Sequence, residues 1–261
     1  MKVDHNGAEG KGAVNIALML DLALHRGVSQ ITGKKVGIDV GDPRDFKTFE
    51  DLYEAFKKEC DYVVKRVLWL GTVAQSVEPH YLRFPFNSCI VSPVAMEKGQ
   101  DLLITDESHS YGISDRAIVD TADSLLAIKK LVFDDKKLTM DALMNALDAN
   151  FEGEQGERIR QMCLAAPKFG NDIDEADLMI KEVGRFSGSV IRSYINPFDV
   201  PCKISREGLS WHYFGGLGVG ALANGRKAKE PLNDGSISPM RGMDKLGPTG
   251  VLRSALKAGF D

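Results

Sequence analysis

A glycine-rich segment near residue 216 has the spacing with which some proteins bind dinucleotides. Gly216-Leu217-Gly218-Val219-Gly220-Ala221 matches the G-x-G-x-x-A fingerprint, in which a pyrophosphate meets a helix N-terminus. That chemistry requires a strand before the glycines and a helix directly after them. Asn224-Gly225 and Pro231 follow instead, and both are turn signals. We therefore predict that this segment does not bind a dinucleotide.

A group of carboxylates after residue 171 is the second pattern that suggests chemistry, in this case calcium binding. Its members are Asp172, Asp174, Glu175 and Asp177. An EF-hand loop would continue to a glycine and a distant glutamate, and that spacing is missing. Carboxylates also stabilise the N-terminus of a helix through its dipole. We interpret the group as the start of a helix and predict no metal site.

Histidine and cysteine are the remaining side chains that act as ligands, bases or nucleophiles. His80, His109 and His212 are far apart and show no ligand spacing. His109 has Glu107 and Tyr111 beside it, which is the one polar cluster resembling a site, and a solvated loop is its alternative interpretation. The cysteines form no C-x-x-C pair, so we expect reduced thiols packed as small hydrophobes at 60, 89, 163 and 202.

Composition and charge exclude several classes of function. The 261 residues are 43% hydrophobic and 27% charged, which is typical of a globular protein with a core. A net charge of -4 favours neither nucleic-acid nor membrane-surface binding. No segment reaches the roughly 18 apolar residues of a membrane span, and the N-terminus lacks the apolar stretch of a signal peptide. We expect a cytoplasmic protein.

Apolar periodicity predicts a mostly helical chain. Thr48, with Asp51 three residues later, has the pattern of a helix N-cap, and Pro79 is expected to end the same helix. His25 stands where a cation suits a helix C-terminus, so we interpret it as a cap. Turn signals fill residues 29–46. The predicted helices cover about 13–25, 49–77, 86–98, 120–132, 139–147, 154–164 and 174–187.

The last seventy residues have a different character. Leu209–Phe214 is short and rich in aromatic residues, which predicts a strand. The turn signals Asn233-Asp234-Gly235, Pro239 and Gly247-Pro248 follow it. We therefore expect ordered loops shaped around a site.

Three stretches resemble a known family, and their order along the chain is also that of the family. Asn224 to Gly235, continuing to Ser238-Pro239 and to Gly247-Pro248-Thr249, is similar to the D-G-R-K-A-x-E-P-L-A-D-G…S-P…G-P-T signature of the pyruvate formate-lyase-like glycyl radical enzymes. Ala165–Asp172 resembles their A-P-K-[FY]-G-N-D segment, and Asp123–Phe133 resembles their D-S-L-A-A-I-K-K-L-V-F helix. The resemblance extends through nearly the whole chain.

The resemblance implies an α/β fold, a ten-stranded barrel of which residues 1–261 form about one half, helix-rich with a loop-rich C-terminal region. The family places a cysteine, commonly followed two residues later by Glu, and a glycine in an R-V-x-G-[YF] motif at the barrel centre. Neither motif is found in this sequence. Hydrogen abstraction requires contact between the participants, so positioning supplies the catalysis. We therefore expect no catalytic residue in this partial domain and no activity of the chain alone.

The resemblance also implies partners. The parent enzyme would act on a small organic substrate, and a radical S-adenosylmethionine activating enzyme with a [4Fe-4S] cluster would install its glycyl radical. We expect no cofactor bound to this chain itself, and we expect a homo-oligomer.

Ala223-Asn224-Gly225 stands where most members have P-D-G. Together with Glu207–Tyr213 and Ser254–Phe260, it looks most like the arylacetate decarboxylase branch, which includes 4-hydroxyphenylacetate decarboxylase. The alternative is a dehydratase or C–N lyase of the diol or choline type. Because the predicted strand would line the family's substrate cavity, we predict that Ser210, Trp211 and His212 bind substrate, together with His109. Core packing would explain the aromatic residues equally well.

A non-catalytic half-barrel subunit is the third interpretation. Such a subunit would expose sheet edges and an apolar face. It therefore predicts self-association of the isolated chain.

Overall fold

The computed structural model describes residues 10–105, 112–196, 199–206, 210–235 and 237–259. Their contacts divide the chain into two compact units. One, called here the strand unit, contains the described parts of 1–14, 64–114 and 188–205. The other, called the helical unit, contains those of 15–63, 115–187 and 206–261. Two long helices, α2 (Phe49–Tyr81) and α8 (Asp174–Arg192), contribute residues to both units.

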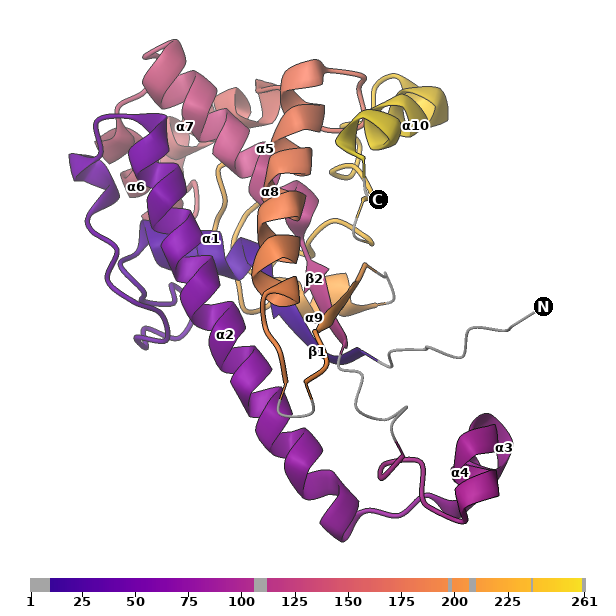
Figure 1. Ribbon diagram of the computed structural model, residues 1–261. Helices are drawn as coiled ribbons and strands as arrows, with labels where there is room; N and C mark the ends of the chain where they lie inside the picture. The colour runs from indigo at the N-terminus through magenta and orange to yellow at the C-terminus, as the bar shows by residue number, and fades with distance from the viewer. Residues whose placement is uncertain (1–9, 106–111, 197–198, 207–209, 236, 260–261) are drawn as a thin grey trace. The chain divides into compact units, whose positions relative to one another are not determined.

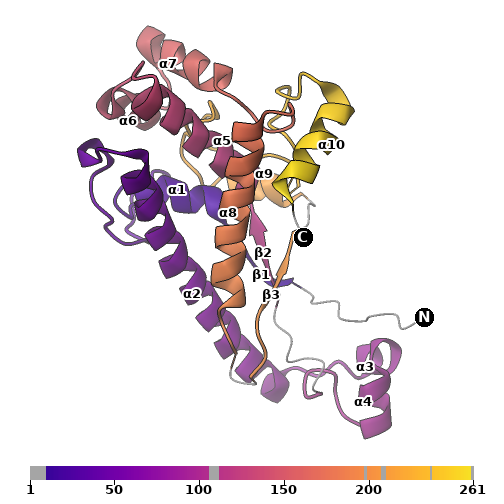
Figure 2. The same ribbon diagram turned by 45° about the horizontal axis from the view of Figure 1, so that its top comes forward.

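A small sheet organises the strand unit. Its strands are β1 (Gly10–Asn15), β2 (Gly112–Arg116) and β3 (Lys203–Ser205), in the order β1-β2-β3 (Figure 2). Strands β2 and β3 are parallel, with Gly112 opposite Lys203 and Ser114 opposite Ser205. Parallel strands need a long crossover connection. Here that connection runs through the helices between residues 116 and 203.

The predicted single helix over 86–98 is wrong, because the chain forms two helices there. These are α3 (Pro85–Val91) and α4 (Pro93–Lys98), which pack against each other (Figure 1). Proline disfavours the helical conformation of the residue before it, and Ser92 is extended. The Ser92 side chain then caps α4 by accepting a hydrogen bond from the Ala95 N–H at 3.0 Å.

Helix α2 begins at the predicted cap. The Asp51 N–H donates to the Thr48 hydroxyl at 3.2 Å, and the Thr48 N–H donates to the Asp51 carboxylate at 2.9 Å. The predicted end at Pro79 is wrong, since α2 continues to Tyr81. Proline removes only its own hydrogen bond, and the bond from the Leu82 N–H to the Glu78 carbonyl (2.8 Å) continues the helical pattern past it.

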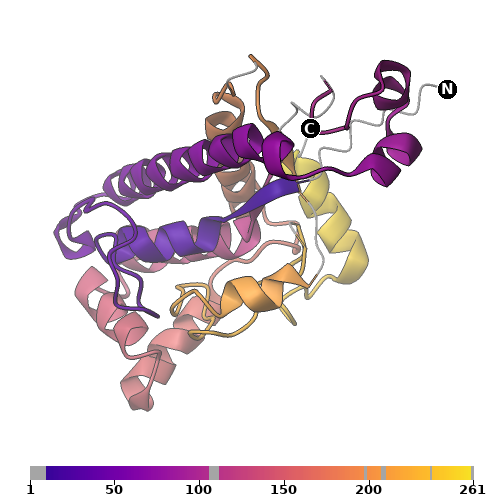
Figure 3. The ribbon, with the colours of Figure 1, turned by 90° about the horizontal axis from the view of Figure 1, so that it is seen from below.

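The helical unit is built around one buried helix. Every residue of α5 (Ile118–Ile128) is buried, and α1 (Ile16–Leu24) packs beside it (Figure 3). A π-helical turn, Lys129–Asp134, continues α5. Buried polar groups need hydrogen-bond partners. The polar residues of α5 must therefore be matched by loops, and this requirement shapes the site described below.

The outer helices of this unit pack in pairs. Helix α6 (Met140–Asp148) contacts α7 (Gly153–Ala165) and the 3₁₀ turn Pro43–Asp45. Thr139 caps α6 through its hydroxyl, which accepts from the Ala142 N–H at 3.1 Å. The C-terminal helix α10 (Gly247–Ala258) was not predicted, because its first turn contains the turn signal Gly247-Pro248. Proline at the first turn of a helix costs no hydrogen bond, which resolves the conflict.

The carboxylates after residue 171 stand at the start of α8, as predicted, and a lysine from α10 forms its shortest ion pairs with two of them. The Lys257 ammonium lies 2.6 Å from Asp172 and 2.6 Å from Asp174. Hydrogen bonds to these two carboxylates raise the pKa of Lys257. Within the described residues, no group of three or more His, Cys, Asp or Glu side chains has the arrangement of a metal site.

The predicted strand Leu209–Phe214 is wrong. Residue 209 lies outside the described residues, and Trp211–Gly216 form the helix α9. A β-carbon on Gly215 would come within 2.4 Å of the Trp211 ring, so the ring lies directly over that glycine. Trp211 also packs against a buried cluster that includes Val219 and Leu222. Tertiary packing of this kind overrides the strand preference of aromatic residues.

The cysteines follow the prediction at three positions of four. Cys60, Cys163 and Cys202 are buried and free, whereas Cys89 on α3 is exposed. Only Ser88 is buried in the short helix α3, so Cys89 is exposed there together with Phe86 and Ile90. In the described part of the chain, no helix is long and apolar enough to cross a membrane.

The cap of α2 provides a test of the fold. Replacing Thr48 with alanine removes the acceptor for the Asp51 N–H, and we expect the free energy of unfolding to fall by about 1 kcal/mol. Urea denaturation followed by circular dichroism measures the change. Glu50→Ala, at an exposed position in the same turn, is the control, and it should lower the free energy of unfolding by only about 0.3 kcal/mol. Equal losses in the two variants would show that Thr48 does not act as a cap.

Candidate functional site

A buried arginine holds the long loop that follows α9. The side chain of Arg226 is 2% exposed. Its guanidinium donates hydrogen bonds to four main-chain carbonyls, those of Gly216 (2.8 Å), Gly220 (2.8 Å), Val219 (3.5 Å) and Glu230 (3.0 Å from Nε). Burial lowers the pKa of Arg226, although the charge of Asp120 opposes this shift. One side chain therefore ties residues 216–230 into a fixed shape.

Asp120, in the first turn of α5, holds the same loop from the other side. Its carboxylate accepts a hydrogen bond from the Asn233 N–H at 2.9 Å and from the Asn224 side-chain amide at 3.3 Å. The Asn224 N–H donates to the Ser124 hydroxyl at 3.1 Å. Burial raises the pKa of Asp120 to about 6, against the lowering effect of its hydrogen bonds and of Arg226. We call these contacts, with those of Arg226, the Arg226 network.

Asp123 makes the corresponding contact to a second loop. One of its carboxylate oxygens accepts a hydrogen bond from the Phe169 N–H at 3.0 Å, and the other has no hydrogen-bond partner among the described residues. The buried Lys168 ammonium donates to the Cys163 carbonyl (2.6 Å) and the Ala166 carbonyl (3.0 Å). Burial raises the pKa of Asp123 to about 7. The three stretches that carry the family resemblance therefore meet around α5.

A third support comes from α1. The Asp21 carboxylate accepts a hydrogen bond from the Gly220 N–H at 3.2 Å and lies 3.0 Å from the His25 ring. His25 caps α1, as predicted, and its other ring nitrogen lies 3.1 Å from Asp148. Burial lowers the pKa of His25, but the hydrogen bond and charge of Asp21, aided by Asp148, outweigh burial and raise it.

One glycine in this region is required twice. Gly225 has φ +98°, a backbone conformation that side chains disfavour, and an added β-carbon would lie 2.6 Å from Leu164. Its carbonyl accepts a hydrogen bond from Arg160 Nε at 2.9 Å, which joins the loop to α7.

A cavity of about 630 Å³ lies against the Arg226 network. Helices α5, α7 and α9 and the described loop residues within 226–235 and 238–243 supply its walls. Its volume is in the range of small-molecule sites. The charged and polar residues that line it include Asp120, Arg160, His212, Arg226, Asn233 and Arg241.

The predicted site residues have different surroundings in the structure. His212 lines the cavity, with Nδ1 3.4 Å from an oxygen of Asp234. Trp211 is partly buried, and the Arg116 guanidinium lies 5.3 Å from its ring centre, a cation–π contact in the helical unit. Ser210 is exposed at the start of α9. His109 lies outside the described residues. Of the described three, only His212 lines the cavity.

Sequence reasoning missed the residues that build this cavity. Asp120 looked like part of a helix start, and Arg226 was recognised only as a letter of a family motif. One signal was available in the sequence. The otherwise apolar helix α5 contains four polar residues, and all of them are buried: Asp120, Thr121, Asp123 and Ser124. Such residues require partners elsewhere in the chain.

The glycine fingerprint lacks the structural context of a dinucleotide site. A helix, α9, stands where the fingerprint needs a strand. The residues after it, over 217–235, form turns held by Arg226. The main-chain carbonyls of the glycine-rich segment accept hydrogen bonds from Arg226 instead.

The raised pKa of Asp123 predicts that stability depends on pH. The folded state holds this carboxyl protonated to about pH 7, whereas the unfolded state ionises near pH 4. The stability contribution is therefore complete below pH 4 and is lost as pH rises through about 7. We expect the unfolding free energy of the wild type to fall between pH 5 and 8 by about 1 to 3 kcal/mol.

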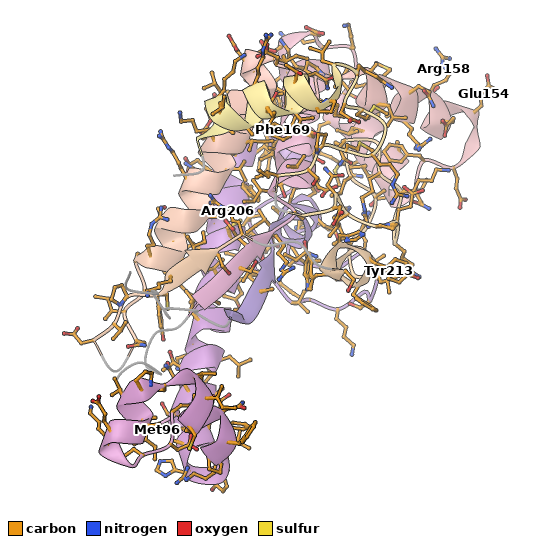
Figure 4. All side chains as sticks on the ribbon, turned by 90° about the vertical axis from the view of Figure 1, so that its right-hand side faces the viewer. Met96, Glu154, Arg158, Phe169, Arg206 and Tyr213 are labelled. Atoms are coloured by element: carbon orange, nitrogen blue, oxygen red, sulfur yellow. The ribbon has the colours of Figure 1, made fainter. Side chains whose placement is uncertain are left out.

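The variant Asp123→Asn tests this expectation. Its amide keeps an acceptor for the Phe169 N–H and cannot ionise, so urea denaturation should show a smaller loss of stability between pH 5 and 8 than the wild type. Glu154→Gln, at an exposed position of α7 (Figure 4), is the control. An unchanged slope in Asp123→Asn would contradict the assignment.

Comparison with known proteins identifies relatives along almost the whole chain. Trans-4-hydroxy-L-proline dehydratase of Clostridioides difficile is 35% identical and isethionate sulfite-lyase of Bilophila wadsworthia is 36% identical, each over 94% of this chain. The glycerol dehydratase structure from Clostridium butyricum matches 94% of the chain with a TM-score of 0.85 and 30% identity. The chain spans only about 30% of the length of each of these relatives.

The comparisons favour the dehydratase and lyase alternative over the predicted decarboxylase branch. The 4-hydroxyphenylacetate decarboxylase glycyl radical subunit of Clostridium scatologenes is 24% identical over 93% of this chain. That identity is lower than for the dehydratase and the sulfite-lyase. The three short stretches on which the branch assignment rested contain too few residues to decide between the branches.

The family and the fold class are both confirmed. Residues 3–212 match the model of the pyruvate formate lyase-like family. The match to the glycerol dehydratase structure shows that the helix-rich α/β fold is part of the barrel of these enzymes. The chain therefore belongs to the glycyl radical enzymes of the pyruvate formate lyase-like family.

Proposed function

We propose that this chain forms part of the barrel of a glycyl radical dehydratase or lyase that eliminates a leaving group from a small hydroxylated substrate. The observation that carries the proposal is the higher identity to a dehydratase and a sulfite-lyase, 35% and 36%, than to a decarboxylase, 24%. Both of the more similar proteins are named for an elimination.

The radical groups themselves are proposed to come from outside these 261 residues. None of the four cysteines has a glutamate two residues later, and no R-V-x-G-[YF] motif occurs in the sequence. A radical S-adenosylmethionine activating enzyme with a [4Fe-4S] cluster would generate the glycyl radical. The residues of this chain then hold the substrate and exclude water, because a thiyl radical reacts only with a hydrogen that it contacts.

His212 is the sequence-predicted residue with the best support for a substrate role. It lines the cavity, and Asp234 lies beside its ring. A histidine beside a carboxylate can donate or accept a proton as a leaving group departs. Ser210 and Trp211 remain weaker proposals, since one is exposed and the other packs on Arg116. His109 remains a proposal from the sequence alone.

The reaction can be tested on the protein expressed with its native flanking sequence. After anaerobic activation, a glycyl signal in electron paramagnetic resonance should appear. The protein is then offered trans-4-hydroxy-L-proline, isethionate, glycerol and 4-hydroxyphenylacetate. We expect loss of water or sulfite from one of the first three substrates. Release of carbon dioxide from 4-hydroxyphenylacetate without any elimination would contradict the proposal and favour the decarboxylase.

A pair of variants on α9 tests the part played by His212. His212→Asn should lower kcat/KM by about a hundredfold, the usual contribution of a general acid or base. Tyr213→Phe is the matched control, because Tyr213 is 52% exposed and projects from the neighbouring position of the same helix (Figure 4). Equal activity of the two variants would remove His212 from the site.

A further inference from the structure

The Arg226 guanidinium lines the cavity and, among the described residues, forms no hydrogen bond or ion pair with a carboxylate. Arg226 is buried, and its hydrogen bonds go to the four neutral carbonyls given above. Asp120, a buried acid of the same wall, has a pKa raised by burial to about 6. At neutral pH this carboxyl is still largely ionised, so Asp120 and Arg226 are two opposite buried charges on the same wall. The Asp120 carboxylate already accepts hydrogen bonds from Asn233 and Asn224. Charges in a low-dielectric interior interact strongly with a ligand.

Two hydrogen-bond donors that line the cavity have no acceptor among the residues that the structure describes. Asn233 is 9% exposed, and its side-chain nitrogen is buried without an acceptor among the described residues. An unsatisfied buried donor costs about 1 to 3 kcal/mol, so it needs an explanation. Arg241, an exposed residue at the rim, also lines the cavity and makes no hydrogen bond or ion pair with any residue that the structure describes. Both donors suit a ligand that supplies acceptor oxygens.

The acidic groups of the cavity lie at its solvent-exposed edge. The Asp234 side chain is 74% exposed and lies beside His212. Glu230 is exposed, and its carboxylate accepts a hydrogen bond from the Lys227 N–H at 3.0 Å. Water and salt screen exposed charges far more than buried ones. The rim acids therefore change the potential inside the cavity only weakly, and the buried charges there are those of Arg226 and Asp120.

We propose that this cavity binds the carboxylate of a small organic acid, with Asn233 and Arg241 as its hydrogen-bond donors. A carboxylate offers acceptor oxygens that match a guanidinium and an amide together. The assignment of this acid as substrate rests on the proposed function, whereas the binding itself does not. Binding is measured without any radical, so the two proposals can fail separately.

Isothermal titration calorimetry of the full chain with glycolate tests the proposal. The neutral analogue ethylene glycol, at the same ionic strength, is the comparison ligand. We expect saturable binding of one glycolate per chain and at least tenfold weaker binding of ethylene glycol. Absence of glycolate binding, or equal binding of the two compounds, would overturn the proposal.

Two arginine variants separate the cavity from general surface charge. Arg241→Gln should weaken glycolate binding by about tenfold. Arg158→Gln is the control, because Arg158 is also exposed and unpaired among the described residues and points away from α7 into solvent (Figure 4). Equal affinity of Arg241→Gln and Arg158→Gln would overturn the role of Arg241.

Nuclear magnetic resonance provides the measurement for Asn233. The side-chain amide signals of Asn233 in a ¹⁵N-labelled chain should shift on addition of glycolate, while those of Asn87 on the strand unit should not. Asn233→Asp places a negative charge at the same position and should abolish binding, with retained circular dichroism as the check on folding. Unshifted Asn233 signals at saturating glycolate would contradict the proposal.

Discussion

The hydrogen bonds of the buried Arg226 guanidinium are the constraint on which the loop after α9 depends. A guanidinium cannot lose its charge inside a protein, so every donor that it buries has to be satisfied. Here main-chain carbonyls satisfy it at residues 216, 219, 220 and 230. A loop without helix or strand thereby has one conformation. The loop in turn forms one wall of the cavity, so the shape of the cavity follows from this side chain.

Helix α5 supplies the complementary half of the constraint. It is buried along its whole length, and its polar residues are oriented toward loops that come from distant parts of the sequence. Asp120 and Ser124 bind the loop around Asn224, and Asp123 binds the loop at Phe169. Asp21 of α1 adds a bond to Gly220. Asp120 and Asp123 carry raised pKa values because they are buried, which is the cost of organising loops from inside a core.

The sequence predicted the helices better than the site, for physical reasons. Apolar periodicity is local, so α1, α2, α6, α7 and α8 could be located from it, and the caps at Thr48 and His25 follow from side-chain chemistry alone. The contact between Asp120 and Asn233 joins residues 113 positions apart, and no local pattern indicates it. The helix α9 was predicted as a strand because packing of Trp211 decides its conformation. The resemblance motifs identified the family but did not show that they meet around α5.

Amide hydrogen exchange tests most directly whether Arg226 holds this loop. The N–H groups of Gly220, Asn224 and Asn233 all donate to buried side chains of the network, so they should exchange slowly in the wild type. Arg226→Lys keeps the charge but cannot bond several carbonyls in a fixed geometry. We predict that exchange at these three amides accelerates at least about tenfold in this variant, while the amides of α6 are unchanged. Equal protection in the two proteins would contradict the central role of Arg226.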